Sequence, residues 1–206
     1  MFVLSLCRQL CPDKIPYKPD IRLGEGADGE VLSLVGDEDK VMKLGILYEQ
    51  RGTNTFERSY QHIQDVLSFF QQKQFDAYTR VYEYGHLGFY TRKNVSFRNG
   101  TQRFGIYYYT MEKLEQISED EAKVFHSILS HEDRGIEKNY SPDEVREMLR
   151  GMSSGLDFDV EKVTLFYENI RSAPVSHLDI HVRNIMKNRL GDFKLIDLDR
   201  IELEKE

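Results

Sequence analysis

The chain reads His177-Leu178-Asp179-Ile180-His181-Val182-Arg183-Asn184 and then, after a short polar interval, Phe193-Lys194-Leu195-Ile196-Asp197-Leu198-Asp199. The first run has the pattern His-x-Asp-x-x-x-x-Asn, which predicts a loop that presents polar side chains. The second run is apolar and ends in carboxylates, which predicts a strand that delivers Asp197. A polar turn followed by an acidic strand end would give the same pattern, so the rest of the chain has to decide between the two.

These residue types suit phosphoryl transfer, which needs an oriented acceptor, metal ions on the phosphates, and positive charge near the transferred group. Asp179 can accept the proton of an acceptor hydroxyl. Asn184 and Asp197 can hold a metal ion through their side-chain oxygens. We therefore take Asp179, Asn184 and Asp197 as the candidate core of a catalytic site.

A glycine pattern stands near the start of the chain, in Ile21-Arg22-Leu23-Gly24-Glu25-Gly26-Ala27-Asp28-Gly29-Glu30-Val31-Leu32. Glycine permits backbone conformations and close approaches that a side chain forbids, so such a hairpin can lie over phosphates. The same pattern marks dinucleotide folds, where it opens a helix after a strand. Here a β-rich run, a turn at 36–39 and a second β-rich run at 40–44 follow, which favours strand, turn and strand.

Lys43 lies in that second run, and its default interpretation is a solvated lysine on an edge strand. A helix should begin near Thr53 to Phe56, because a cap precedes apolar residues at helical spacing. Those apolar residues are Tyr60, Ile63, Leu67 and Phe70. Glu57 is the candidate to hold Lys43 by an ion pair, Glu49 is the alternative, and an exposed glutamate is the default for both.

The order of these segments resembles the eukaryotic-like protein kinase superfamily, with a strand ending in Tyr109-Thr110-Met111-Glu112 between the helix and the His177 loop. Asn184 also lies thirteen residues before Asp197, a spacing usual in that family. The resemblance implies an α+β fold of the bilobal kinase type, with residues 1–206 as a single minimal kinase domain. A strand-rich N-lobe would span about 15–111, a hinge 112–114, and a reduced helical C-lobe 115–206.

The resemblance also implies ATP and Mg²⁺ as cofactors. Lys43 would grip the phosphates, and the hairpin would cover them with Gly24, Glu25, Gly26, Ala27, Asp28, Gly29 and Val31. Met111 would occupy the gatekeeper position, and the backbone of Glu112 and Leu114 would contact the adenine, unless this segment is an ordinary strand end. Asn184 and Asp197 would hold the metal, and Asp179 would orient and deprotonate the acceptor.

His181 stands two places after Asp179, as in aminoglycoside and choline phosphotransferases and in some bacteriophage kinases. It either helps with the charge of the transferred phosphoryl group or is a polar loop residue. Asp197-Leu198-Asp199 replaces the usual Asp-Phe-Gly, so Asp199 either binds a second metal or is exposed. The run His181-Val182-Arg183-Asn184-Ile185-Met186 resembles the catalytic loop of T7-type phage kinases.

The sequence stops at Glu206, so we expect no activation loop and a C-lobe reduced as in short phage or bacterial-effector kinases. That likeness implies protein substrates in a host cell. Truncation of the lobe can expose apolar surface, which an activating protein partner would cover. The low cysteine count predicts action in a reducing cytoplasm. A small-molecule phosphotransferase is the alternative enzyme. A pseudokinase that only binds a partner is the alternative outside catalysis.

Composition agrees with one compact domain, because 206 residues with 40% hydrophobic content can bury a sizeable core. No long apolar span is present, so no membrane crossing is expected. The net charge of −7 disfavours broad nucleic-acid binding. Cys7 and Cys11 are too few for a disulfide framework. The apolar run at 1–6 is expected to form an edge strand or a packing arm.

Local signals predict the remaining elements. Helices are expected over Ser118 to Leu129, from Ser141 onward, and from Val160 to Ile170, each with a cap or an apolar stripe. Asn99-Gly100 should form a hairpin tip within a small basic region. Its default interpretation is a solvated turn, and binding of an acidic peptide is the alternative.

Overall fold

The computed structural model describes residues 3–26, 29–51, 55–96, 100–129, 140–177 and 180–203, and it shows a mixed α+β protein. The chain divides into two compact units. Unit 1 contains residues 1–72 and 81–113, and unit 2 contains 73–80 and 114–206. The boundary at 113/114 falls in the expected hinge, whereas the assignment of segment 73–80 to unit 2 was not expected from the sequence.

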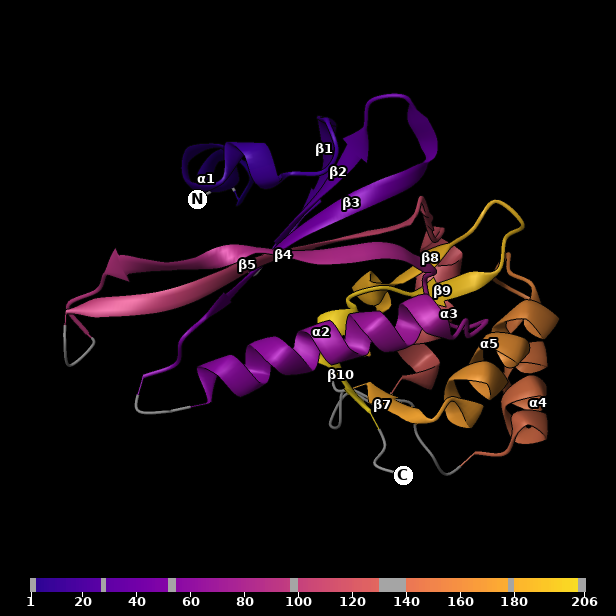
Figure 1. Ribbon diagram of the computed structural model, residues 1–206. Coiled ribbons are helices and arrows are strands. Elements are labelled where there is room, and N and C mark those ends of the chain that lie inside the picture. Colours follow the sequence, from indigo (N-terminus) through magenta and orange to yellow (C-terminus); the bar gives the residue numbers. More distant parts are fainter. Residues whose placement is uncertain are drawn as a thin grey trace. The chain divides into compact units, whose positions relative to one another are not determined.

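Unit 1 is built on a five-stranded antiparallel sheet with the strand order β1-β2-β3-β5-β4 (Figure 1). The strands are β1 (Pro19–Glu25), β2 (Gly29–Leu34), β3 (Asp37–Tyr48), β4 (Val81–Lys93) and β5 (Thr101–Glu112). The glycine pattern therefore joins two strands of a hairpin, as predicted. The next strand carries Lys43, also as predicted, and β4 and β5 form one long hairpin.

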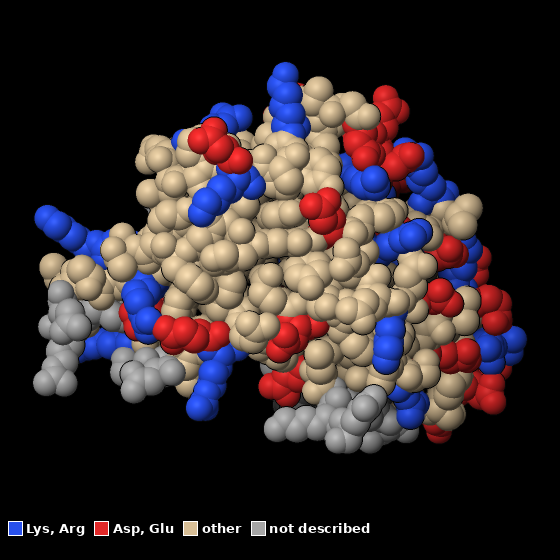
Figure 2. Space-filling view, viewed as in Figure 1, with Lys and Arg blue, Asp and Glu red and all other residues tan. Residues whose placement is uncertain are grey.

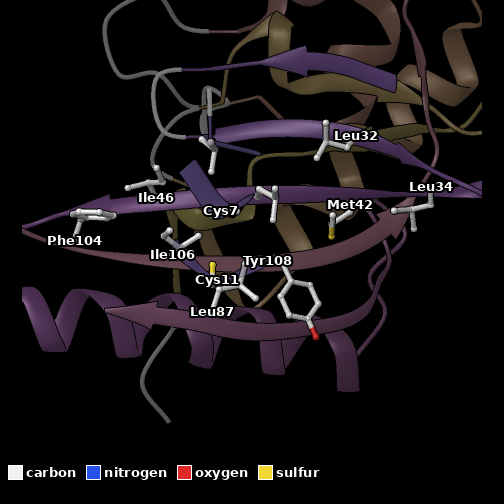
Figure 3. Close-up of a cluster of buried hydrophobic side chains, with 12 residues drawn as sticks. Cys7, Cys11, Leu32, Leu34, Met42, Ile46, Leu87, Phe104, Ile106 and Tyr108 are labelled. Carbon is white, nitrogen blue, oxygen red and sulfur yellow. The ribbon is translucent and has the colours of Figure 1, made fainter. Parts of the chain in front are cut away.

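One face of this sheet is covered by helix α1 (Val3–Leu10), which is followed by the short 3₁₀ helix η1 (Pro12–Lys14). Cys7 and Cys11 are free thiols that lie buried among apolar side chains of the sheet (Figure 3). Burial raises the pKa of the Cys7 thiol to about 12. The predicted edge strand at the N-terminus is therefore corrected to a helix, and the alternative of a packing arm describes its contacts.

Helix α1 is stabilised by a residue far away in the sequence. The carboxylate of Glu30 on β2 accepts a hydrogen bond of 2.8 Å from the amide of Leu4, in the first turn of α1. A negative charge at this end of a helix satisfies an unpaired amide and interacts favourably with the helix dipole. Glu30 is buried, and Arg22 on β1 lies 3.8 Å from its other oxygen.

The opposite face of the sheet is covered by helix α2 (Phe56–Gln72), which begins where the sequence predicts. Its buried stripe includes the predicted Tyr60, Ile63, Leu67 and Phe70. A side chain at Gly105 would place its Cβ 2.4 Å from the ring of Tyr60, so glycine is required there for the helix to approach β5. The hydroxyl of Tyr60 donates to the carbonyl of Ile106 at 2.8 Å.

Unit 2 contains three α-helices among the described residues: α3 (Glu119–Ile128), α4 (Pro142–Met152) and α5 (Val160–Ser172). Ser118 and Ser141 form capping boxes with Glu121 and Glu144, so the predicted helix starts are confirmed. An edge-to-face aromatic group joins Phe125 on α3 and Phe166 on α5 to Phe193, the first residue of strand β9 (Phe193–Leu195).

Five short strands complete unit 2. They form a three-stranded sheet in the order β6-β8-β9 and a two-stranded sheet of β7 and β10. Their bounds are β6 (Glu115–Gln116), β7 (Val175–His177), β8 (Ile185–Lys187), β9 (Phe193–Leu195) and β10 (Ile201–Leu203). The 3₁₀ helices η2 (Val182–Asn184) and η3 (Leu198–Arg200) stand directly before β8 and β10.

The surface carries both signs of charge. On the face shown in Figure 2, Lys and Arg side chains are interspersed with Asp and Glu, and neither sign forms a continuous band. Within the described ranges, no helix has the length and apolar character needed to cross a membrane.

Candidate active site

The hairpin of β8 and β9 brings the two predicted metal-binding residues to the same end. Ile185 pairs with Leu195, and the amide of Ile196 donates to the carbonyl of Asn184 at 2.9 Å. Asn184, which precedes β8, and Asp197, which follows β9, therefore lie at the same open end of the hairpin. Asn184 is buried, at 6% exposed, so its side chain is held within the protein.

Asp197 has a left-handed backbone, with φ 67° and ψ 51°. Among the described residues it is the only one other than glycine with a positive φ. Such a conformation costs free energy for a residue with a side chain and persists where the surroundings impose it, often at functional sites. Here β9 precedes Asp197 and the fully buried Leu198 follows it, so both flanks are fixed.

The strands on both sides of the predicted catalytic loop are also fixed. β7 precedes the loop and pairs with β10, with His177 opposite Ile201. Asp179 lies outside the described residues. After it, Ile180 is buried, and the carbonyl of His181 accepts a hydrogen bond of 2.8 Å from the amide of Asn184. His181 is therefore placed at the start of the turn that leads into Asn184.

Lys43 is the cation that the sequence predicts for the phosphates, and it lies in the middle of the sheet of unit 1. It pairs with Val31 on β2 and with Tyr109 on β5, and it is only 8% exposed. Its ammonium lies 5.7 Å from the ring centre of Tyr109. The default of a solvated lysine on an edge strand is therefore excluded by its burial.

The glycines of the hairpin differ in how much space a side chain would have at each position. A Cβ at Gly29 would lie 2.7 Å from the carbonyl oxygen of Leu44 and 3.3 Å from Cε of Lys43, so glycine is required for β2 to approach β3. At Gly24 and Gly26 a Cβ would meet no atom of the other described residues within 4 Å, chain neighbours apart. Ala27 and Asp28 lie outside the described residues, and the amide of Gly26 closes the hairpin on the carbonyl of Gly29 at 2.9 Å.

Glu57 and Glu49 both bind the guanidinium of Arg103 on β5. This corrects the predicted ion pair of Glu57 with Lys43. Arg103 stands six residues before Tyr109, which is opposite Lys43, so the two cations are about 20 Å apart along the sheet. The first turn of α2 lies at the level of Arg103, and Glu57 is therefore too early in the helix to reach Lys43.

Gln64 is a partly buried polar residue of α2 that the sequence did not single out. It lies one helical turn after Tyr60, and its side-chain nitrogen is buried without a hydrogen-bond partner among the described residues. Tyr60 packs on Tyr107, two residues before Tyr109. Along the direction of β5, Gln64 is therefore nearer than Glu57 to Lys43. The sequence does not show this, because it depends on the direction in which α2 runs along β5.

Two exposed apolar residues on β1 were also missed. Ile21 is 62% exposed and Leu23 is 49% exposed. Arg22 between them approaches Glu30 on the α1 side of the sheet, and the pairing of β1 with β2 is irregular on both sides of Arg22. Alternating exposed apolar residues beside a glycine pattern are the signal that could have identified them.

The expected hinge begins at the end of β5. Met111 is buried and pairs with Val41, and Glu112 pairs with Lys40. The amide of Lys113 donates to the carbonyl of Asp39 at 2.8 Å, which extends this register by one residue. Two more predicted nucleotide contacts lie on the first hairpin, where Glu25 ends β1 and Val31 lies within β2. Leu114 begins the long second part of unit 2.

Within the part of the chain that the structure describes, no three His, Cys, Asp or Glu side chains form a metal-binding group. The predicted ligand pair of Asn184 and Asp197 is an amide with a single carboxylate, which is a different donor set. A scan against protein-family models finds no match, and a comparison with curated proteins finds none either.

Proposed function

We propose that the protein is a minimal ATP- and Mg²⁺-dependent kinase of the eukaryotic-like type that phosphorylates serine or threonine hydroxyls of proteins. The observation that carries this proposal is the β8–β9 hairpin. It brings Asn184 and Asp197 together at one end and holds Asp197 in a left-handed conformation between two anchored segments.

The donor chemistry of this pair fits Mg²⁺. Magnesium prefers oxygen ligands and is commonly bound through one or two protein groups together with phosphate oxygens and water. The Asn184 amide and the Asp197 carboxylate would hold it in this proposal. Bound Mg²⁺ supplies charge neutralisation on the phosphates.

Unit 1 supplies features that suit a nucleotide. Lys43 is buried in the sheet, and no side chain or backbone of the other described residues covers Gly24 and Gly26 within 4 Å, so a phosphate chain would approach the backbone there. Ile21 and Leu23 expose apolar surface on β1, directly before the glycine hairpin. An adenine ring would cover such surface, while the end of β5 at Met111 and Glu112 would contact its edge.

Asp179 would act on the acceptor. As the acceptor oxygen forms its bond to the γ-phosphorus, the bond from that phosphorus to the departing ADP breaks, and the carboxylate of Asp179 takes the hydroxyl proton. His181 would lie beside the transferred group. Its backbone carbonyl is tied to the amide of Asn184, which sets its position relative to the metal-binding end.

The proposal is tested with purified protein, Mg²⁺ and γ-labelled ATP, alone and with a cell lysate. Asp179→Asn removes the proposed base, and Asp192→Asn is the matched control. Asp192 lies in the turn between β8 and β9, 3.3 Å from the ammonium of Lys162, and has no role in the proposed chemistry. Label on protein with the wild type and the control, but not with Asp179→Asn, is the expected result.

Equal labelling by Asp179→Asn would contradict the assignment of the base. Label transferred only to small hydroxyl compounds would replace the protein acceptor by an aminoglycoside- or choline-like one. No Mg²⁺-dependent ATP binding at all would contradict the kinase and favour a pseudokinase that retains only partner binding.

A further inference from the structure

Strand β9 has a second neighbour besides β8. It is segment 73–80, which follows α2 in the chain and belongs to unit 2. The amide of Leu195 donates to the carbonyl of Ala77 at 2.7 Å, and the amide of Thr79 donates to the carbonyl of Leu195 at 2.9 Å. The ammonium of Lys194 also binds the carbonyl of Asp76 at 2.6 Å. The strand that delivers Asp197 is therefore an inner strand, held on both edges.

Tyr78 lies at the centre of this contact. It pairs with Leu195 in parallel orientation and is only 2% exposed. Its ring is stacked on the imidazole of His177, with ring centres 6.4 Å apart and planes inclined by 25°. His177 is the last residue of β7 and is itself buried.

The imidazole of His177 connects this stack to Asp197. Its Nε2 lies 3.4 Å from the carbonyl oxygen of Ile196. That carbonyl belongs to the peptide between Ile196 and Asp197, and rotation of this peptide plane changes φ of Asp197. A side chain that fixes the imidazole therefore also limits the rotation that would release the left-handed conformation.

We infer that Tyr78 is a positioning residue, which holds the carboxylate of Asp197 in its metal-binding orientation through the imidazole of His177. The inference rests on the proposed function for the metal, but the contacts that carry it are independent of any ligand. Partners that orient a metal ligand without touching the metal often change metal affinity by about tenfold or more when they are removed. A core residue that only stabilises the fold would not have this effect.

Three variants separate the two roles. Tyr78→Phe keeps the ring and the stack, whereas Tyr78→Leu removes the ring but remains apolar. Tyr167→Leu is the control for lost stability, because Tyr167 is a buried tyrosine of unit 2, at 1% exposed, on α5. Its hydroxyl donates to the carbonyl of Tyr140 at 3.0 Å, away from the stack.

The first measurement is hydrogen exchange of the Ile196 amide, which donates to Asn184, relative to amides of α5 in the same variant. In Tyr78→Leu we expect its relative exchange to be about threefold to tenfold faster than in the wild type. In Tyr78→Phe and Tyr167→Leu the ratio should stay at the wild-type value. An unchanged ratio in Tyr78→Leu would overturn the role of Tyr78, whatever the protein catalyses.

The second measurement is the Mg²⁺ concentration that gives half-maximal ATP turnover at saturating ATP. We expect about a tenfold increase for Tyr78→Leu and values near the wild type for the other two variants. An equal increase in Tyr78→Leu and Tyr167→Leu would reduce Tyr78 to a structural residue. Absence of Mg²⁺-dependent turnover in the wild type would overturn the proposed function, and the exchange ratio would then decide the inference by itself.

Discussion

The left-handed backbone of Asp197 allows a test that separates its conformation from its charge. We compare Asp197→Gly with Asp197→Ala, two variants that both lack the carboxylate. Glycine adopts a positive φ without steric cost, whereas an L-residue with a Cβ loses about 1–2 kcal/mol in this region. Glycine also loses more conformational entropy on folding, by about 0.5–1 kcal/mol relative to alanine.

The balance of these two effects should leave Asp197→Gly more stable than Asp197→Ala by about 0.5–1 kcal/mol. For a chain of this length, 1 kcal/mol corresponds to a Tm difference of about 2–4 °C. Urea and thermal unfolding followed by circular dichroism measure it. Both variants should lack phosphotransfer under the proposed function, because neither retains a metal ligand at this position.

The control is the same pair of substitutions at Asp192, whose φ is not positive. There the glycine variant should be the less stable of the two, by about 0.5–1 kcal/mol. The stability order of the glycine and alanine variants should therefore reverse between positions 197 and 192. If Asp197→Gly is equal to or less stable than Asp197→Ala, the backbone of Asp197 is not held in the left-handed region and the argument fails.

Two further predictions concern stability. Gly45→Ala should destabilise the protein by about 1–3 kcal/mol in urea unfolding, because its Cβ would lie 2.2 Å from the ring of Tyr107. The control Gly151→Ala, whose Cβ would meet no other described residue within 4 Å outside its own helix, should be neutral or stabilising. Equal effects of the two substitutions would refute the close approach at Gly45. Glu121→Gln should cost about 1–3 kcal/mol at pH 7, since it removes a buried carboxylate 2.9 Å from the ammonium of Lys187. Burial disfavours the ionised form of Glu121, but the hydrogen bonds from Lys187 and Ser118 together outweigh this and lower its pKa below the ordinary value of 4.5. The contribution of the carboxylate is therefore present above pH 4.5 and is lost as the pH falls through the lower folded pKa. A variant that loses as much stability on acidification as the wild type would contradict this assignment.

Local sequence signals predicted most of the elements. The capping boxes that begin at Ser118 and Ser141 and the apolar stripe of α2 act within a few residues, so they can be recognised without knowledge of the fold. The order of glycine pattern, Lys43, His177 loop and Asp197 strand could be found in the same way.

The failures involve contacts that are distant in sequence. Helix α1 is stabilised by Glu30, 26 residues from Leu4 in the chain, and by burial against the sheet. The short apolar run that forms α1 does not indicate that Glu30 will accept a hydrogen bond from its first turn. Glu57 was matched to Lys43 by its place in the first turn of a helix, but the path of α2 along β5 sets its true partner as Arg103.

The sequence by itself determined which residue types are available for chemistry and where most helices and strands begin. The tertiary structure alone decided that Asn184 and Asp197 stand together, that Asp197 adopts a positive φ, and that Tyr78 reaches His177. The physical reason is that propensities and caps act over one or two turns of chain, whereas strand register and helix direction depend on which surfaces are buried against each other. The register of β8 and β9 thus sets the relative positions of Asn184 and Asp197, which cannot be predicted from the sequence.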